Sequence, residues 1–381
     1  MDDLKRRIRA AARQLGFSLC GFAPVAPAPS AAVPHAEFVR RWLADGNAAG
    51  MAYLERGLAK RLDPRLILRQ VRSIITVGYR YLPPPSPRVD WQGELRGRIA
   101  AYALDTDYHR IVQRKLDELA AAITELRRDL VVLSYIDTGA ILEREWASSG
   151  GIGWFGKNTN LLHTEEGSYF FLGELLTNLA FEPEPLVPDH CGTCTRCLDL
   201  CPTQALKPGY ILDARLCISY LTIEHRGPIP VELRPQLGNW IFGCDVCQEV
   251  CPWNEKLVKR DGVPDSASLF PYLPALLRLD DAAFNRHFQR HAIRRARREG
   301  FARNVAVALG NTRNPAAVPA LSEALDSDPS PLVRGHAAWA LGVIDDRAAR
   351  RALELARARE PDTDVCAELA QSLERSDRAS S

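Results

Sequence analysis

The chain has 381 residues, too many for one compact core, so two or three domains are expected. Its 49 basic and 47 acidic residues leave a formal charge of +2, so the overall charge does not point to a polyanionic partner and a basic surface must come from local clustering. No stretch reaches the roughly 18 apolar residues of a membrane span, and the N-terminus lacks the apolar core of a secretory signal, so we expect a cytoplasmic protein without membrane association.

Residues 1–180 alternate helical and strand patterns. The first 17 residues predict an amphipathic helix, residues 73–82 (SIITVGYRYL) a strand, and residues 108–126 a helix with regular apolar spacing. Residues 129–137 then read as a buried strand that ends in Asp137, and residues 167–178 as another strand. The pattern indicates an α/β or α+β domain over residues 1–180, in a chain whose overall class we expect to be α+β.

Asp137 is a candidate functional residue because it lies where α/β proteins place ligands, at the carboxyl end of a predicted strand. Burial there would raise the pKa of its carboxyl group and allow it to act as a general acid. It is equally well explained as the N-cap of a helix over DTGAILERE. The residues alone favour neither interpretation.

The stretch GIGWFG (151–156) matches the glycine spacing of a dinucleotide-binding loop. Such a loop follows a strand and opens a helix, whereas this one follows the helical pattern AILEREWASS. The context argues against a nicotinamide site. A tight structural turn and a close approach of the backbone to a bulky group both remain open.

A proline-rich acidic segment (181–189) leads into eight cysteines, which we assign to a domain over residues 181–260. They form one run with the spacing C-x2-C-x2-C-x3-C-P, a later C-x2-C-x3-C-P, and Cys217 between them. In two-cluster ferredoxins the cysteine before proline ligates the other [4Fe–4S] cube. That rule predicts two ligand sets: Cys191, Cys194, Cys197 and Cys251 for one cube, and Cys201, Cys217, Cys244 and Cys247 for the other.

Two four-cysteine zinc sites are the alternative, since structural zinc also takes four thiolates. The paired spacings, each closed by x3-C-P, are rare in zinc ribbons and favour iron–sulfur clusters. Clusters of this class move single electrons, so the domain predicts electron transfer but names no substrate.

The C-terminal part (281–381) starts with an arginine-rich segment and continues with a helical repeat. NVAVALGN (304–311) and HAAWALGV (336–343) match at an offset of 32 residues, as do VPALSEAL and RRALELAR, which is typical of HEAT-like helix pairs. The segment RHFQRHAIRRARREGFAR (286–303) predicts a helix that binds nucleic-acid phosphates. It is also consistent with a solvated helix paired with acids, with Ile293 and Phe301 as its buried stripe.

Several longer stretches together resemble epoxyqueuosine reductases, the cobalamin-dependent iron–sulfur enzymes of tRNA queuosine synthesis. The resemblance covers nearly the whole chain. It includes the eight cysteines, GRIAAYALDTDYH, DTGAILEREWASSGGIGWFGKNT, FGCDVCQEVCPWN and RRARREGFARNVAVALGN. Ala140 departs from the pattern, in which proline is common at this position.

The resemblance implies a fold and a reaction. The N-terminal domain would bind cobalamin with a fold related to reductive dehalogenases and flavin-type nitroreductases. Two [4Fe–4S] clusters would pass electrons from a low-potential donor to the cobalt. The epoxide of tRNA-bound epoxyqueuosine would then be reduced to the alkene in the last step of queuosine synthesis, by a monomeric enzyme.

The resemblance also implies roles for single residues. Asp137 matches the family's proton donor, and Arg144 would line the same pocket. Corrin contacts are implied for Arg61, Lys157, Asn158, Thr159, Phe242 and Gly243. The stem-loop of a tRNA with a G-U-N anticodon would be bound by His225, Arg226, Arg294, Arg295, Arg297 and Arg298.

Two other functions compete with this prediction. A reductive-dehalogenase-like enzyme would share the cofactors but has no need for an arginine-rich arm and helical repeats. A ferredoxin-like electron carrier would not need an α/β domain of 180 residues before its clusters.

Overall fold

The computed structural model describes residues 2–26, 33–81, 89–127, 129–260 and 270–379. The chain forms two compact units, each assembled from three segments. The first unit comprises Met1–Pro83, Asp107–Arg215 and Val246–Gly262, and the second comprises Pro84–Thr106, Leu216–Asp245 and Val263–Ser381. The consecutive domains expected at 1–180, 181–260 and 281–381 follow the sequence motifs and stay a prediction. Within the described ranges, no helix has both the length and the apolar character needed to cross a membrane.

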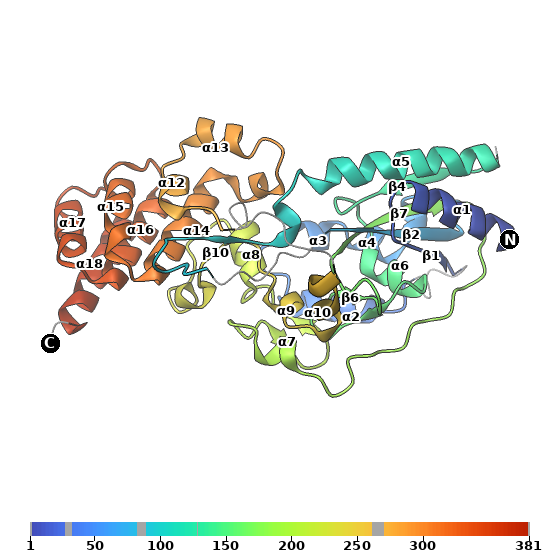
Figure 1. The fold of residues 1–381 in the computed structure, drawn as a ribbon, viewed down its shortest axis with the longest axis horizontal. Coiled ribbons are helices and arrows are strands. Elements are labelled where there is room, and N and C mark those ends of the chain that lie inside the picture. The colour runs from blue at the N-terminus through green and yellow to red at the C-terminus, as the bar shows by residue number, and fades with distance from the viewer. Residues whose placement is uncertain (1, 27–32, 82–88, 128, 261–269, 380–381) are drawn as a thin grey trace. The chain divides into compact units, whose positions relative to one another are not determined.

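The first unit is built on an antiparallel sheet with the strand order β1-β2-β7-β4 (Figure 1). Its strands are β1 (Leu19–Pro24), β2 (Ser73–Arg80), β7 (Phe170–Thr177) and β4 (Val132–Tyr135). The predicted strands at 73–82 and 167–178 are therefore confirmed. The predicted strand at 129–137 is shorter than expected and lies at the edge of the sheet, where Leu133 is exposed, so it is not the buried strand that its apolar run suggested.

Two separate cores cover the two faces of this sheet, because alternate side chains of a strand point to opposite sides. Helices α1 (Asp2–Gln14) and α5 (Tyr108–Leu126) pack over one face, with Ile75 and Leu175 in the core. The short helix α6 (Glu143–Ser149) packs over the other, with Ile74, Trp146 and Leu176. The α5 bounds coincide with the helix predicted from apolar spacing.

The rest of the first unit consists of short elements around the sheet. The stretch GIGWFG enters a hairpin of β5 (Trp154–Phe155) and β6 (Leu161–Leu162), so its glycines serve a structural turn. A Cβ on Gly153 would lie 2.0 Å from the Leu162 carbonyl oxygen, which explains why glycine is needed there. The other elements are α2 (Ala36–Ala44), α3 (Tyr53–Arg56), α4 (Leu58–Leu62), η2 (Pro64–Leu66), α7 (Arg196–Asp199), β8 (Leu206–Lys207), β9 (Ile211–Leu212), α9 (Val246–Glu249) and α10 (Pro252–Arg260).

The second unit is mainly helical, with one short parallel pair of strands, β3 (Arg98–Ile99) and β10 (Trp240–Phe242). Helices α14 (Arg297–Thr312), α16 (Pro331–Ile344) and α18 (Thr363–Ala379) pack in sequence, and α15 (Val318–Ser327) and α17 (Arg347–Arg357) pack beside them (Figure 1). Gly310 approaches α16 and Gly342 approaches α18 so closely that a Cβ on either would lie 2.7–2.8 Å from the neighbouring helix. These two glycines occupy equivalent places in the predicted 32-residue repeat.

The remaining elements of the second unit lie before the repeat or between its helices. They are η3 (Ala101–Ala103), α8 (Ile218–Ile223), η4 (Arg234–Leu237), α12 (Leu273–Leu277), α13 (Asp281–His287), η5 (Ala292–Ala296) and η6 (Pro315–Ala317). The arginine-rich segment is therefore not the single helix predicted. It is broken between α13 and η5, and it turns into α14 at Arg297, where φ is +60°. Ile293 and Phe301 are buried, as expected.

Candidate active site

Asp137 lies in a loop that follows the edge strand β4 and precedes α6. Its backbone has a φ of +48°, a left-handed conformation that is uncommon for non-glycine residues, although aspartate adopts it more readily than most. Its backbone N–H donates a hydrogen bond to the Glu143 carboxylate. Because α6 begins at Glu143, with Leu142 as its N-cap, the helix-capping interpretation of Asp137 is wrong.

The Asp137 side chain is 53% exposed and contacts an imidazole. His109 Nε2 lies 2.9 Å from Asp137 Oδ2, and His109 Nδ1 lies 2.6 Å from Asp107 Oδ1. Burial of the ring opposes its charged form, but the hydrogen bonds to Asp137 and Asp107 outweigh burial and raise the pKa of His109. The arrangement favours a proton on the imidazole between two carboxylates.

Two arginines hold the backbone around this loop. Arg61 donates from Nη1 to the carbonyl oxygens of Gly139 (3.3 Å) and Ile141 (3.2 Å). Arg144 donates to the Thr159 carbonyl oxygen, and its side chain is exposed. Although the residue is exposed, the protein atoms packed around its guanidinium lower the pKa of Arg144, and the acids Glu143 and Asp137 counteract that effect. Arg144 is thus a cation that remains accessible beside Asp137.

The cysteines predicted for the first cluster are neighbours in the first unit. Burial, followed by the nearby Cys251 and Cys191, raises the pKa of the Cys197 thiol to about 11, and Cys194 adds to the effect. Cys251 and Cys191 also share an apolar cluster with Trp154. In the second predicted set, Cys201 and Cys247 belong to the first unit and Cys217 and Cys244 to the second. The assignment of that set stays a prediction.

The loops that carry these cysteines are held by polar side chains. Lys157 Nζ donates to the carbonyl oxygens of Gly192 (2.6 Å) and Cys194 (2.9 Å), and Asn158 Nδ2 donates to that of Cys247 (3.3 Å). In the part of the chain that the structure describes, no three His, Cys, Asp or Glu side chains are grouped as ligands of a single metal ion. A four-iron cube is a different case, because each of its thiolates binds a different iron.

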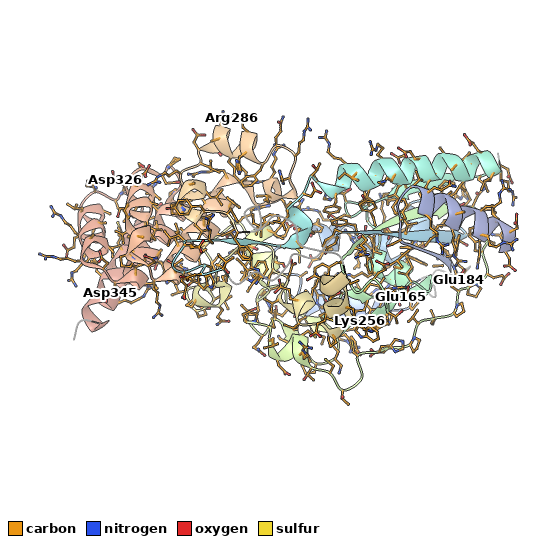
Figure 2. The ribbon with its side chains drawn as sticks, in the orientation of Figure 1. Glu165, Glu184, Lys256, Arg286, Asp326 and Asp345 are labelled. Atoms are coloured by element: carbon orange, nitrogen blue, oxygen red, sulfur yellow. The ribbon has the colours of Figure 1, made fainter. Side chains whose placement is uncertain are left out.

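Exposed arginines gather in the second unit around η5 and the start of α14. Arg294, Arg295 and Arg297 are exposed, and Arg286 on α13 projects outward (Figure 2). Arg295 pairs with Glu224 at 2.9 Å. We call Arg286, Arg294, Arg295 and Arg297 the basic surface.

Other arginines of the same segment are buried and structural. Arg298 is 8% exposed and binds the Asp328 carboxylate through two nitrogens. Arg303 is fully buried and donates to the carbonyl oxygens of Leu221, His225 and Gly227. Arg303 therefore fixes the loop that carries His225 and Arg226.

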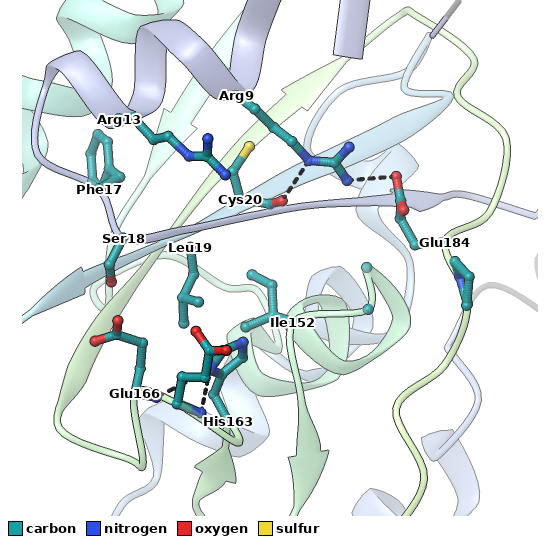
Figure 3. A pocket seen from close by; sticks show the side chains of 14 residues that line it. Arg9, Arg13, Phe17, Ser18, Leu19, Cys20, Ile152, His163, Glu166 and Glu184 are labelled. Carbon is teal, nitrogen blue, oxygen red and sulfur yellow. Dashed lines mark hydrogen bonds and ion pairs between the residues drawn. The ribbon is translucent and has the colours of Figure 1, made fainter. Parts of the chain in front are cut away.

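A separate cavity of about 430 Å³ opens in the first unit between α1, β1 and the segment 163–166. Arg9 contacts Glu184 at 2.9 Å along its wall, and His163 accepts hydrogen bonds from two backbone N–H groups (Figure 3). None of the predicted site residues lines this cavity. It is therefore not the candidate active site.

Three protein-family models match the chain. Residues 61–138 match the model described as Epoxyqueuosine reductase QueG, DUF1730, and residues 190–254 match the 4Fe-4S double cluster binding domain. Residues 290–374 match HEAT repeats. The predicted double-cluster region and helical repeat are thereby confirmed.

Curated relatives match over most of the chain. An epoxyqueuosine reductase of Xanthomonas campestris is 39% identical over 89% of this chain and 96% of its own length. That of Bacillus cereus is 34% identical over 98% of this chain and 97% of its own. The chain belongs to the epoxyqueuosine reductase family. It is accordingly an oxidoreductase.

Solved structures of the family have the same fold. An epoxyqueuosine reductase crystallised with an epoxyqueuosine-modified tRNA-Tyr stem loop matches with a TM-score of 0.90, at 32% identity, over 99% of both chains. A Bacillus subtilis structure, in which the catalytic loop with its aspartate is swung out of the active site, matches with a TM-score of 0.87 at 32% identity over 98% of this chain and 99% of that one. The α+β architecture expected from the sequence is thus confirmed.

The structure brings Asp137, Arg61, Arg144 and Thr159 together around one loop, and their roles at a corrin and in catalysis stay predictions. The four other residues expected at the corrin, Lys157, Asn158, Phe242 and Gly243, make hydrogen bonds within the protein, and their contact with a corrin also stays a prediction. Lys157 and Asn158 bind the cysteine loops. Phe242 is buried and its carbonyl accepts the Ala100 N–H, while the Gly243 N–H donates to Thr222 Oγ1.

The residues expected to bind tRNA differ in their contacts within the protein, and their role in binding stays a prediction. Arg298 pairs with Asp328 inside the fold, and Arg226 donates to the carbonyl oxygens of Ala296 and Arg295. The His225 ring is bonded to the Pro228 carbonyl oxygen at 2.9 Å. These interactions give Arg298 a structural role, whereas Arg294, Arg295 and Arg297 stay on the surface.

Sequence reasoning missed His109 as a site residue. The histidine is within the quoted stretch GRIAAYALDTDYH, two residues after Asp107, but the pattern gives no sign of its partner. That partner, Asp137, is 28 residues further along the chain, and only the packing of α5 beside β4 makes the two neighbours.

Proposed function

We propose that this enzyme reduces the epoxide of tRNA-bound epoxyqueuosine to the alkene, with Asp137 as the proton donor, as the last step of queuosine synthesis. The observation that carries the proposal is the exposed Asp137 carboxylate, bonded to His109 at 2.9 Å in a chain with a double-cluster domain. Removal of the epoxide oxygen as water consumes two electrons and two protons. The chain has acidic side chains suited to donate the protons and a double-cluster domain suited to deliver the electrons.

Asp137 would protonate the departing oxygen, because a positioned acid assists the cleavage of a C–O bond. His109 would return a proton to Asp137, since its ring is bonded to that carboxylate on one side and to Asp107 on the other. Arg144, accessible beside Asp137, would stabilise negative charge that develops on the oxygen.

The two [4Fe–4S] clusters would be held by Cys191, Cys194, Cys197 and Cys251, and by Cys201, Cys217, Cys244 and Cys247. The neighbouring thiols of the first set support this assignment. Such clusters move one electron at a time, so a pair suits a two-electron reduction supplied by a low-potential donor.

Cobalamin is part of the proposal through the family resemblance, with a domain related to reductive dehalogenases and nitroreductases. When bound, it would supply a low-potential cobalt that carries electrons from the clusters to the epoxide. The polar groups around the loop fit such a ligand, because Asp137 and Arg144 are both exposed. Thr159 lies beside them and would line the corrin, while Arg61 would act through the loop backbone.

The RNA substrate is inferred from the family and from the basic surface. The related structure with a tRNA-Tyr stem loop supports a G-U-N anticodon stem-loop as the ligand. Arg294, Arg295 and Arg297 would contact its phosphates, with His225 and Arg226 in the loop next to them. The swung-out catalytic loop of the Bacillus subtilis structure supports a loop around Asp137 that moves during the reaction.

The decisive experiment is mass spectrometry of nucleosides from tRNA of cells that lack this protein. We expect epoxyqueuosine to accumulate and queuosine to disappear, and a plasmid-borne copy of the gene to reverse both changes. Normal queuosine levels in the deletion strain would reject the proposed function. They would favour one of the two competing functions, a small-molecule reductase or an electron carrier.

A further inference from the structure

Glu174 is a buried acid for which the reaction described above has no role. It lies in the middle of β7, opposite Thr76 of β2 and Tyr135 of β4, on the sheet face that α6 covers. Its exposed fraction is 0%, and neither carboxyl oxygen meets a hydrogen-bond donor among the described residues. A carboxyl group buried in this way is unfavourable as an anion, and buried polar groups in proteins generally have a hydrogen-bond partner.

That partner is Glu143, the first residue of α6. The side chains of Glu143 and Glu174 form a carboxyl–carboxyl contact. Ionised carboxylates only accept hydrogen bonds, so this contact requires a proton on one of the two groups. Glu143 has a second interaction, because its carboxylate accepts the backbone N–H of Asp137.

The surroundings decide which acid keeps the proton. Burial, followed by the charge of Glu143, raises the pKa of Glu174 well above its ordinary value. Burial and then the charge of Asp137 raise the pKa of Glu143 to about 7, while its bond from the Asp137 N–H and the charge of Arg144 lower it. Glu174 is therefore the neutral donor and Glu143 the acceptor.

The charged groups that face the pair come from three elements. Asp137 in the loop repels both acids, Arg144 on α6 attracts Glu143, and Arg61 on α4 interacts with Glu143 and Asp137. These cations lie on the Glu143 side. For Glu174, the charged groups that act on it are the acids Glu143 and Asp137.

We propose that Glu143 and Glu174 form a proton-dependent latch that holds the Asp137 loop in its working conformation. The neutral Glu174 carboxyl holds the Glu143 side chain, and Glu143 in turn holds the Asp137 backbone at its unfavourable φ of +48°. From this conformation Asp137 contacts His109. Ionisation of Glu174 places two anions side by side, so Glu143 moves away and releases the loop. Glu174 is thus a positioning residue for Asp137.

The latch rests on the proposed function only for the role of Asp137, and its test needs neither cobalamin nor RNA. Hydrogen–deuterium exchange of the peptide 136–142, corrected for the intrinsic effect of pH, would be compared for three proteins: the wild type, Glu174→Gln and Glu174→Met. The glutamine amide still donates to Glu143 but does not titrate, whereas methionine fills similar space without a donor.

We expect the wild-type loop to be protected at pH 6 and to exchange at least about tenfold faster at pH 9, because the hydrogen bond from the Asp137 N–H to Glu143 is then lost. Glu174→Gln should stay protected at both pH values, and Glu174→Met should exchange fast at both. Amides of the β2–β7 ladder serve as the internal control and should stay protected in all three proteins.

Equal, pH-independent protection in the wild type and Glu174→Met would overturn the latch, as would fast exchange in Glu174→Gln over an intact sheet. A wild-type enzyme that shows the expected exchange pattern but leaves epoxyqueuosine in tRNA unchanged would count against the proposed function and leave the latch supported.

Discussion

Buried charged side chains have opposite kinds of partner in the two units. In the second unit, the buried Arg303 donates to three backbone carbonyl oxygens, and Arg298 binds Asp328 through two nitrogens. In the first unit, no described residue donates a hydrogen bond to the buried Glu174, and its contact is a second acid, Glu143, to which Glu174 donates.

The contrast separates buried charged groups that stabilise the fold from those that serve the candidate active site. A buried cation with all its donors used holds segments together, and its removal leaves carbonyl groups unsatisfied. A buried acid paired with an acid adds little stability, but it keeps a proton close to Asp137. The predictions below test this contrast, starting with the largest effect.

Asp137→Asn should lower the rate of epoxide reduction by about 10²–10⁴-fold, because the amide cannot donate an acidic proton. The fold should be unaffected, since the side chain is half exposed and asparagine has the same shape. Single-turnover reduction of epoxyqueuosine tRNA, followed by nucleoside mass spectrometry, measures the loss. Asp129→Asn, at an exposed position before β4, is the matched control and should retain activity. A near-normal rate for Asp137→Asn would exclude it as the proton donor.

Arg303→Met should lower the free energy of unfolding of the second unit by roughly 3–5 kcal/mol, because the carbonyl groups of Leu221, His225 and Gly227 lose their donor. Denaturant unfolding followed by tryptophan fluorescence measures the change. Arg347→Met, an exposed position on α17, is the control and should change stability by less than about 0.5 kcal/mol. Equal stability of the two variants would mean that the buried bonds of Arg303 contribute nothing.

His109→Gln should slow the reaction about tenfold or more at low pH and flatten its pH dependence. The pKa of His109 is raised above 6.5, chiefly by its bonds to Asp137 and Asp107 against the effect of burial. Its charged form and the stability it contributes are therefore complete below 6.5 and lost as pH rises through the raised value. Rates and unfolding free energies of the two proteins should converge at high pH. A constant difference across the pH range would show that His109 does not act through its proton.

Reversal of two exposed charges, Arg294→Glu with Arg297→Glu, should weaken tRNA stem-loop binding about tenfold at low salt and make its salt dependence shallower. Stability should hardly change, because neither side chain is buried. The double variant Arg347→Glu with Arg351→Glu carries the same charge change on α17 and is the control. If both double variants lose the same affinity, general charge and not the basic surface controls binding.

The local features of this protein were predictable from the sequence, and the pairings between distant residues were not. The α5 helix was predicted with its observed bounds because apolar spacing is a local signal. Which arginines of the arginine-rich segment are buried was not predictable, because the residue that binds Arg298 is 30 positions away and the loop that binds Arg303 is about 80 positions away. Lys157 and Asn158 stand beside the glycine turn in sequence, but they bind cysteine loops 35–89 residues further on.

The double-cluster domain, the 32-residue helical repeat and the family were readable from the amino-acid order, because spacing along the chain carries each of these. The contact of His109 with Asp137, the contact of Glu174 with Glu143 and the burial of particular arginines became visible only in the folded chain. Burial and proton sharing depend on which strands and helices pack together. The pairing of β7 with β2 and β4 beneath α6 brings these acids together, and no spacing pattern records it.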